Sequence, residues 1–311
     1  MALTATGLRR ASSRRAAPSL ALLAALSVAL TGCTYASQAL SEADLSPDIT
    51  VDAVPSIAAL VPPAVAADGK LTVASELSYP PMEFVAADGV TPVGLDIDII
   101  TAVAKVLGLE VDIQSATFDS IIPAIGTRYE VGASSFTITP ERLQAVNMVS
   151  YFEAGSLLAV QAGNPAGVDP ANLCGLTVGV QTGTTQQDAL NAATGECVAN
   201  GAKPIEILTY TSGSDVTTNL VGGKVQAMFA DSPVTAYAVE QTGGAIESLG
   251  DVQASAPYGI VVAKGDMELA AAIQAALQHL MDNGILAQLA DHWGNASGAA
   301  TTSEINPGAN P

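Results

Sequence analysis

The sequence predicts an α/β fold with largely parallel sheets. Strand-type and helix-type patterns alternate through residues 71–75, 97–107, 111–114 and 118–125. Later in the chain, short apolar runs end at turns with capping residues that open further helices. Of the 311 residues, 49% are hydrophobic and only 13% are charged, which is enough apolar material for a globular body with an ample core.

The first 32 residues have the layout of an export signal. Four arginines, the last of them Arg15, precede an apolar run from about residue 20 to residue 30, which is too short to span a bilayer. The run is followed by Thr31-Gly32-Cys33, which resembles a bacterial lipobox. We therefore expect residues 1–32 to be a lipoprotein signal peptide, and Cys33 to carry a lipid that anchors the protein to the extracytoplasmic face of the bacterial cell membrane. An ordinary signal peptide is the alternative, and the arginine pairs leave twin-arginine export open beside the general route.

Both ends of the mature chain are predicted to extend beyond the folded body. Residues 33–68 are rich in Ala, Ser, Pro and Asp and predict a lipid-anchored tether, in which an apolar patch at 57–65 docks late onto the body. Two apolar-periodic segments, 267–281 and 285–293, predict a closing pair of helices. The polar residues 298–311 predict a loose tail.

The charge of the chain argues against nucleic acid as a partner. There are 30 acidic residues against 11 basic ones, a net charge of −19, and the signal peptide holds four of the basic residues. Such a surface repels nucleic acid and anionic lipid. No nucleic-acid partner is therefore expected, and membrane attachment is expected to depend on the lipid anchor.

An arginine stands at the start of a predicted helix in the first half of the chain. Residues 135–139 alternate like a strand and then meet a Thr-Pro-Glu turn, which has a capping hydroxyl and a proline at the first helical position. Arg142 follows at once, and a guanidinium matches a carboxylate in bidentate fashion. A surface arginine in a weak salt bridge is the alternative. Only Arg128 and Arg142 remain once the signal peptide is removed, and this scarcity favours a dedicated role for Arg142.

An aspartate and a glycine-threonine turn hold similar positions in the second half. The apolar run 224–230 ends at Asp231, and in open α/β sheets ligands bind at the carboxyl ends of strands. Asp231 suits an ammonium group, although a helix-capping role stays open. The run 176–180 likewise leads into residues 181–186, which open a helix whose amino terminus attracts anions. Together with Arg142, these turns predict a pocket that grips both ends of an α-amino acid.

Several short blocks of the chain follow one another in the order of a known family. They are residues 79–84, 94–99, 118–124, 137–142, 183–186, 231–233 and 258–260. Through these blocks most of the mature chain resembles the family 3 extracellular solute-binding proteins, the polar amino-acid receptors of ABC importers. The resemblance implies the two-lobed type II periplasmic binding protein fold, with lobe 1 in residues 69–155 and 262–297 and lobe 2 in residues 156–261. Two crossover strands, near 156–161 and 258–262, are expected to join the lobes around a ligand cleft.

The same resemblance implies roles at the cleft. Arg142 is expected to hold the ligand carboxylate with Thr137 and Thr185, Asp231 its α-ammonium group, and Ser135 to supply a further acceptor. The other expected contacts are the aromatic pair Tyr79 and Phe118, the carboxylates Glu76 and Asp96, and the polar side chains Gln186 and Ser134. An ordinary core role stays open for the aromatic pair. Glu76 replaces a shorter aspartate of the family, which leaves the preference for a basic side chain open.

The cysteines agree with export. With Cys33 lipidated, Cys174 and Cys197 remain as one pair, and a pair in an exported domain favours a disulfide over two buried free thiols. Neither has the spacing of a zinc site, so no metal is expected.

Three classes of function follow from these observations. The first is the receptor of an amino-acid importer, a monomer that delivers its ligand to a membrane permease and its ATPase. The second is an enzyme on the same fold, because cyclohexadienyl dehydratases resemble this family, and the third is a solute sensor without a transport role. The only histidines, His279 and His292, lie in the terminal helices, and no catalytic residue or cofactor is predicted. A basic or amide ligand is favoured among Arg, Lys, His, Gln and Glu.

Overall fold

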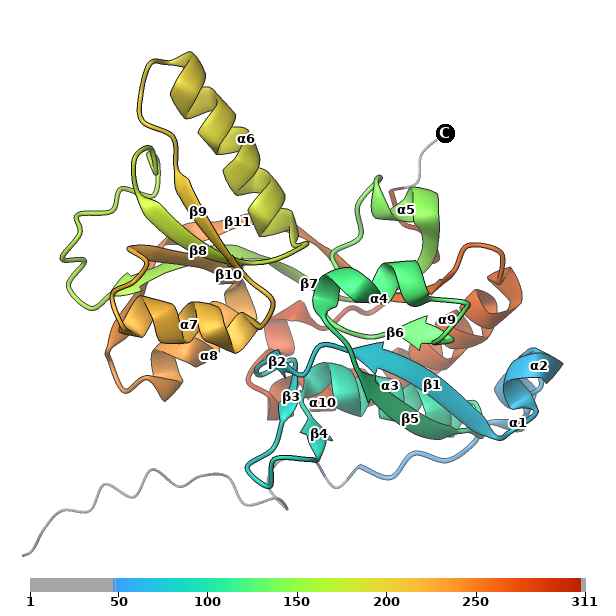
Figure 1. Cartoon of the computed structure of the whole chain (residues 1–311). Coiled ribbons are helices and arrows are strands. Elements are labelled where there is room, and N and C mark those ends of the chain that lie inside the picture. Colours follow the sequence, from blue (N-terminus) through green and yellow to red (C-terminus); the bar gives the residue numbers. More distant parts are fainter. Residues whose placement is uncertain (1–46, 48, 309–311) are drawn as a thin grey trace, which may run out of the picture. The chain divides into compact units, whose positions relative to one another are not determined.

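The centre of the molecule is an eight-stranded sheet with the strand order β5-β1-β6-β11-β7-β10-β8-β9 (Figure 1). The computed structural model describes residues 47 and 49–308. The signal peptide, Cys33 and the first part of the predicted tether lie outside the described residues. The predicted α/β class is confirmed, because helices alternate with parallel strand pairs on both sides of β7 and β11.

Lobe 1 is built on three parallel strands. β1 pairs with β5 along its whole length and with β6 at Val73 and Ala74. The helix after β4 buries Leu95, Ile99 and Val103 because apolar residues recur along one face. The elements of this lobe are β1 (Lys70–Ser75), β2 (Ser78–Tyr79), β3 (Glu83–Val85), β4 (Pro92–Val93), α3 (Leu95–Val106), β5 (Glu110–Ser115), α4 (Phe118–Ala124), β6 (Val131–Gly132) and α5 (Arg142–Ala145).

Lobe 2 repeats this arrangement. Its strands β10, β8 and β9 are parallel, and the central strand, β8, is almost wholly buried. The disulfide predicted between Cys174 and Cys197 is present, and it ties the segment before β8 to the last turns of α6. The elements of this lobe are β8 (Thr177–Gln181), α6 (Thr185–Ala199), β9 (Glu206–Tyr210), α7 (Gly213–Val221), β10 (Ala227–Asp231) and α8 (Ser232–Gln241).

Two long antiparallel strands join the lobes, β7 (Val146–Gln161) and β11 (Ile246–Ala263). At one end β11 pairs with β6 of lobe 1, and at the other end β7 pairs with β10 of lobe 2. Figure 1 shows both strands running between the two groups of strands. They contain the short crossovers predicted from the sequence and are much longer, because the paired strands continue into the sheets of both lobes.

Two terminal segments pack on the body, and here the predictions need correction. The tail is not loose in its described part: Ile305 bridges to Val149, and the Asn306 side chain accepts a hydrogen bond from the Met148 N–H at 2.8 Å. The tether was expected to dock only through its apolar patch at 57–65, and the docked part begins earlier, at Ile49. Residues 49–66 form α1 (Pro55–Ala58) and α2 (Pro63–Ala66), and their apolar side chains cover the core of lobe 1 because that face would otherwise be open to water.

The predicted closing pair of helices is present as α9 (Met267–Asp282) and α10 (Ile285–His292). Gly284 between them adopts a left-handed conformation (φ 69°), which glycine enters without steric cost. Both helices bury apolar faces in the core of lobe 1, and a short 3₁₀ helix, η2 (Ala296–Gly298), follows them. Within the described residues, none of the helices combines the length and apolar character needed to cross a bilayer.

Candidate functional site

A small cavity between the two lobes is lined by most of the residues that the sequence singled out. Its walls leave about 10 Å³ of free space, room for the centre of about one water molecule. Its lining residues are Tyr79, Phe118, Ser135, Thr137, Arg142, Gln181, Thr184, Thr185, Gln186 and Asp231. The first five come from lobe 1 and the last five from lobe 2. Of the predicted contacts, Glu76, Asp96 and Ser134 do not line this cavity.

Arg142 begins α5, and its backbone N–H is capped by the Thr139 hydroxyl at 3.2 Å. Its guanidinium donates to the Thr137 carbonyl at 2.8 Å and to the Gly183 carbonyl of lobe 2 at 3.1 Å. The group also lies over the ring of Phe118, with 5.4 Å between the guanidinium carbon and the ring centroid. Burial lowers the pKa of Arg142 from its usual value, and nearby carboxylates, Asp231 first among them, oppose this effect. The side chain is held as a cation at the wall of the cavity.

Asp231 is the last residue of β10 and the amino-terminal cap position of α8, yet its side chain makes no capping hydrogen bond. The carboxylate is instead directed at the cavity. Its Oδ2 accepts from the Tyr79 hydroxyl at 3.0 Å, and its Oδ1 accepts from Gln186 Nε2 at 2.7 Å. Gln186 Nε2 also donates to Ser156 Oγ at 2.7 Å. Burial raises the pKa of Asp231, because a charge without solvent is costly, while these hydrogen bonds lower it.

Thr184 caps α6 and Thr185 begins it, and Thr184 was not among the predicted contacts. The Thr184 hydroxyl caps the helix by accepting the Gln187 N–H at 3.2 Å. The amino terminus of this 15-residue helix therefore faces the cavity, opposite Arg142. The partial positive charge of a helix amino terminus and a guanidinium both favour an anionic group between them.

Glu76 does not line the cavity but contacts Gln181, which does. It is 7% exposed, and its carboxylate accepts from Ser78 Oγ at 2.6 Å and from Gln181 Nε2 at 3.0 Å. Gln181 does line the cavity, and the sequence reasoning had missed it as a site residue. The available signal was a polar residue at the end of the buried strand β8. Burial raises the pKa of Glu76.

Asp96 does not reach the cavity, which corrects the expectation that it contacts the ligand side chain. It sits in the first turn of α3, and its carboxylate accepts the Tyr151 hydroxyl and the Ser135 N–H, each at 2.7 Å. Glu83, which was not among the predicted site residues, lies beside Asp96. This wholly buried carboxylate accepts the hydroxyls of Ser134 at 2.9 Å and Ser135 at 3.1 Å. Its signal was an acidic residue within an otherwise apolar block.

The buried carboxyls predict how stability depends on pH. Burial raises the pKa of Asp96 to about 6, well above its unfolded value. The folded protein therefore holds a proton that the unfolded chain has lost, and the resulting stability, up to about 3 kcal/mol, is present below about pH 4 and lost as the pH rises through about 6. We expect the free energy of unfolding by urea to fall between pH 4 and pH 7, and to fall less in Asp96→Asn. An equal pH dependence in both proteins would contradict this assignment.

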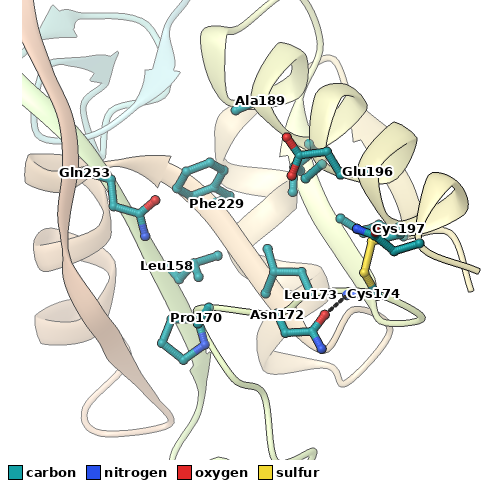
Figure 2. Close-up of a pocket in the computed structure, with 15 residues that line it drawn as sticks. Leu158, Pro170, Asn172, Leu173, Cys174, Ala189, Glu196, Cys197, Phe229 and Gln253 are labelled. Atoms are coloured by element: carbon teal, nitrogen blue, oxygen red, sulfur yellow. Dashed lines mark hydrogen bonds between the residues drawn. A yellow bond between two sulfur atoms is a disulfide. The ribbon is translucent and has the colours of Figure 1, made fainter. Parts of the chain in front are cut away.

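A larger cavity of about 330 Å³ lies in lobe 2, beside the disulfide (Figure 2). Phe229, Leu158 and Leu173 provide apolar walls, and Figure 2 shows the disulfide at one edge and Gln253 at the other. Glu196 is the only ionisable side chain among the lining residues of this cavity. The cavity therefore offers no cationic side chain to the carboxylate of a ligand. Of these two cavities, the smaller one is suited to a zwitterion, because Arg142 and Asp231 both line it. Among the described residues, no cluster of His, Cys, Asp and Glu is arranged to hold a metal ion.

The fold and this cavity define an extracellular solute-binding protein. The chain belongs to the bacterial extracellular solute-binding proteins, family 3, whose model matches residues 71–296. It is 36% identical to the arginine-binding protein ArgT of Corynebacterium glutamicum over 296 residues, which cover 93% of this chain and 96% of that protein. The two-lobed fold and the family resemblance predicted from the sequence are thus confirmed.

Solved structures agree with this assignment. An ancestral arginine-binding protein bound to arginine superposes with a TM-score of 0.67 at 31% identity, over 72% of this chain and 98% of that one. The ancestral amino acid-binding protein AncCDT-1, a precursor of cyclohexadienyl dehydratase, superposes with a TM-score of 0.66 at 29% identity, over 74% and 97% of the two chains. The relatives named here are binding proteins.

Proposed function

We propose that this protein is the lipid-anchored receptor of an ABC importer and that it captures a basic or amide L-amino acid, with arginine the first candidate. The observation that carries the proposal is the shared cavity of Arg142 and Asp231, one from each lobe. A guanidinium and a buried carboxylate on opposite walls complement the carboxylate and the ammonium group of an amino acid. The arginine-binding relatives support arginine as the candidate.

The contacts expected for the α-carboxylate of the ligand are better defined than those for its side chain. The hydrogen bonds to Thr137 and Gly183 use two of the five N–H donors of Arg142, and the others remain for a ligand oxygen. Thr185 and the amino terminus of α6 add donors from lobe 2. The α-ammonium group replaces the Tyr79 hydroxyl as a donor to Asp231, with Ser135 as a second acceptor, and the ring of Phe118 packs against the ligand side chain.

The side chain of the ligand is expected to point toward Gln181, whose amide donates to the carboxylate of Glu76. A guanidinium or ammonium group that displaces the amide of Gln181 pairs with the carboxylate of Glu76, while an amide side chain pairs with Gln181 itself. Both arrangements favour a polar ligand with a donor at its end. The carboxylate of a glutamate side chain is repelled by Glu76.

Closure of the lobes supplies the mechanism. Because the cavity leaves space for about one water molecule, an amino acid enters only when the lobes separate and Tyr79 moves off Asp231. A ligand that bridges Arg142 and Asp231 then favours the closed form, since it contacts both walls only there. The closed form is the one that a permease and its ATPase recognise. Cys33, through its lipid, keeps the receptor at the extracytoplasmic membrane face.

The test is calorimetric titration of the mature protein, with Cys33→Ser, against each of the twenty amino acids. We expect arginine or a related amino acid to bind with micromolar or tighter affinity, and Arg142→Ala to weaken binding by about a hundredfold or more, because a charge-assisted pair is lost. Arg128→Ala is the matched control. It removes the other arginine of the mature chain, which lies over Tyr129 and outside the cavity, and should leave the affinity unchanged. If no amino acid binds the wild-type protein, the proposal fails.

A further inference from the structure

Glu83 is a buried acid that the proposed binding mechanism has not used. It lies in β3, and no part of its surface is exposed. Both carboxylate oxygens accept serine hydroxyls, Oε1 from Ser134 and Oε2 from Ser135. Burying a carboxyl group is costly, and burial raises the pKa of Glu83 well above its usual value. An apolar residue would fill the same space at lower cost, so the position calls for a specific role.

Ser135 is the link between Glu83 and the cavity. It lines the cavity opposite Asp231 and has a left-handed backbone (φ 51°), which is uncommon for residues other than glycine. Two carboxylates hold it there. Asp96 accepts its backbone N–H, and Glu83 accepts its hydroxyl.

The direction of the second hydrogen bond determines what Ser135 offers a ligand. A hydroxyl group has one proton to donate and two lone pairs that accept. In the ionised form of Glu83 both oxygens can only accept, so the proton of Ser135 is directed to Glu83 and the lone pairs of Ser135 are the part available to a neighbouring donor. Ser134 shows the same behaviour, because its hydroxyl donates to Glu83 and accepts the Glu76 N–H at 3.0 Å.

We propose that Glu83 is a positioning residue for ligand recognition, which takes the hydroxyl proton of Ser135 so that Ser135 presents an acceptor to the ligand ammonium group. The inference rests on the proposed function, in which Ser135 and Asp231 together face that group. Glu83 thereby acts on affinity without touching the ligand.

A double-mutant cycle tests the proposal, with the amino acid that binds most tightly as the probe. Glu83→Gln places an N–H beside one serine hydroxyl, and that hydroxyl must then accept rather than donate. We expect Glu83→Gln to weaken binding about tenfold in the wild-type background and less than about twofold in the Ser135→Ala background, because the two residues act as one unit. In the Ser134→Ala background the loss should remain about tenfold.

Glu130→Gln is the matched control, because Glu130 is also a glutamate with a pKa raised by burial and accepts a backbone N–H, from Thr72, away from the cavity. It should leave the affinity unchanged. If Glu83→Gln does not fold, Glu83→Asp in the same backgrounds gives a second cycle. Equal losses with and without Ser135 overturn the inference while the proposed function stands. Absence of binding in the wild-type protein overturns both.

Discussion

Asp231→Asn is expected to weaken amino-acid binding by about a hundredfold or more while the ligand-free protein becomes no less stable. The carboxylate is buried, and burial raises its pKa, so removing its charge relieves a desolvation cost in the ligand-free protein. An asparagine accepts the Tyr79 hydroxyl through its Oδ1 atom, and its Nδ2 donates to Gln186 once the Gln186 amide is flipped to present its oxygen. It offers no negative charge to an ammonium group, and the loss therefore appears only in the complex. Calorimetric titration and urea unfolding measure the two effects separately.

Asp188→Asn is the control for Asp231→Asn. Asp188 is an exposed residue in the first turn of α6. Its carboxylate attracts the guanidinium of Arg142 electrostatically, but Asp188 does not line the cavity. Its neutralisation should change the affinity by less than about threefold, because exposed charges are screened by solvent and salt. If both variants lost affinity to the same extent, the net charge of the cleft and not a contact with Asp231 would explain the binding.

Gly213→Ala is expected to block lobe closure without unfolding the protein. A β-carbon at Gly213 would lie 2.5 Å from Cδ2 of the Tyr79 ring and 3.1 Å from the Ser78 carbonyl oxygen. Gly213 opens α7 in lobe 2, whereas Ser78 and Tyr79 belong to lobe 1, and the Gly213 N–H donates to Ser78 Oγ at 2.9 Å. The Tyr79 ring cannot easily move away from this β-carbon, because its hydroxyl donates a hydrogen bond to Asp231. When the lobes separate the clash disappears, so only the closed form is destabilised.

Small-angle scattering and titration check this prediction together. In the wild-type protein the radius of gyration should fall when the amino acid is added. In Gly213→Ala it should stay constant, and the affinity should fall about tenfold or more, since binding energy is no longer gained from both lobes. Gly195→Ala is the control, because a β-carbon at this position in α6 meets no atom within 4 Å. Normal compaction of Gly213→Ala on ligand addition would show that this contact does not limit closure.

The site was partly accessible to sequence reasoning. Arg142 and Asp231 could be singled out because each follows a strand and begins a helix, and this local pattern places a side chain at the carboxyl edge of a sheet. The structure places both in one cavity. Thr137 and Thr185 belong to the same turns. Gln181 was missed, although it ends a buried strand, because one polar residue at a strand end is weak evidence by itself.

The contacts of the buried carboxylates could not be predicted from the sequence. The sequence placed Asp96 at the ligand, whereas the structure places it behind Ser135, against Tyr151. The contact of Glu83 with Ser135 joins residues 52 positions apart. Composition and periodicity identify which residues are polar, but not which buried oxygen a given hydroxyl meets, since that depends on how separate segments pack.

The α/β class, the disulfide pair and the family could be predicted from the sequence, because strand and helix periods, paired cysteines and short motifs are local properties of the chain. How the lobes meet depends on tertiary packing. This packing set the length of β7 and β11, docked residues 49–66 and 299–306 on the body, and turned Glu83 and Asp96 toward Ser135. These features depend on burial and on hydrogen bonds between segments remote in sequence, and each forms only once both partners are in place.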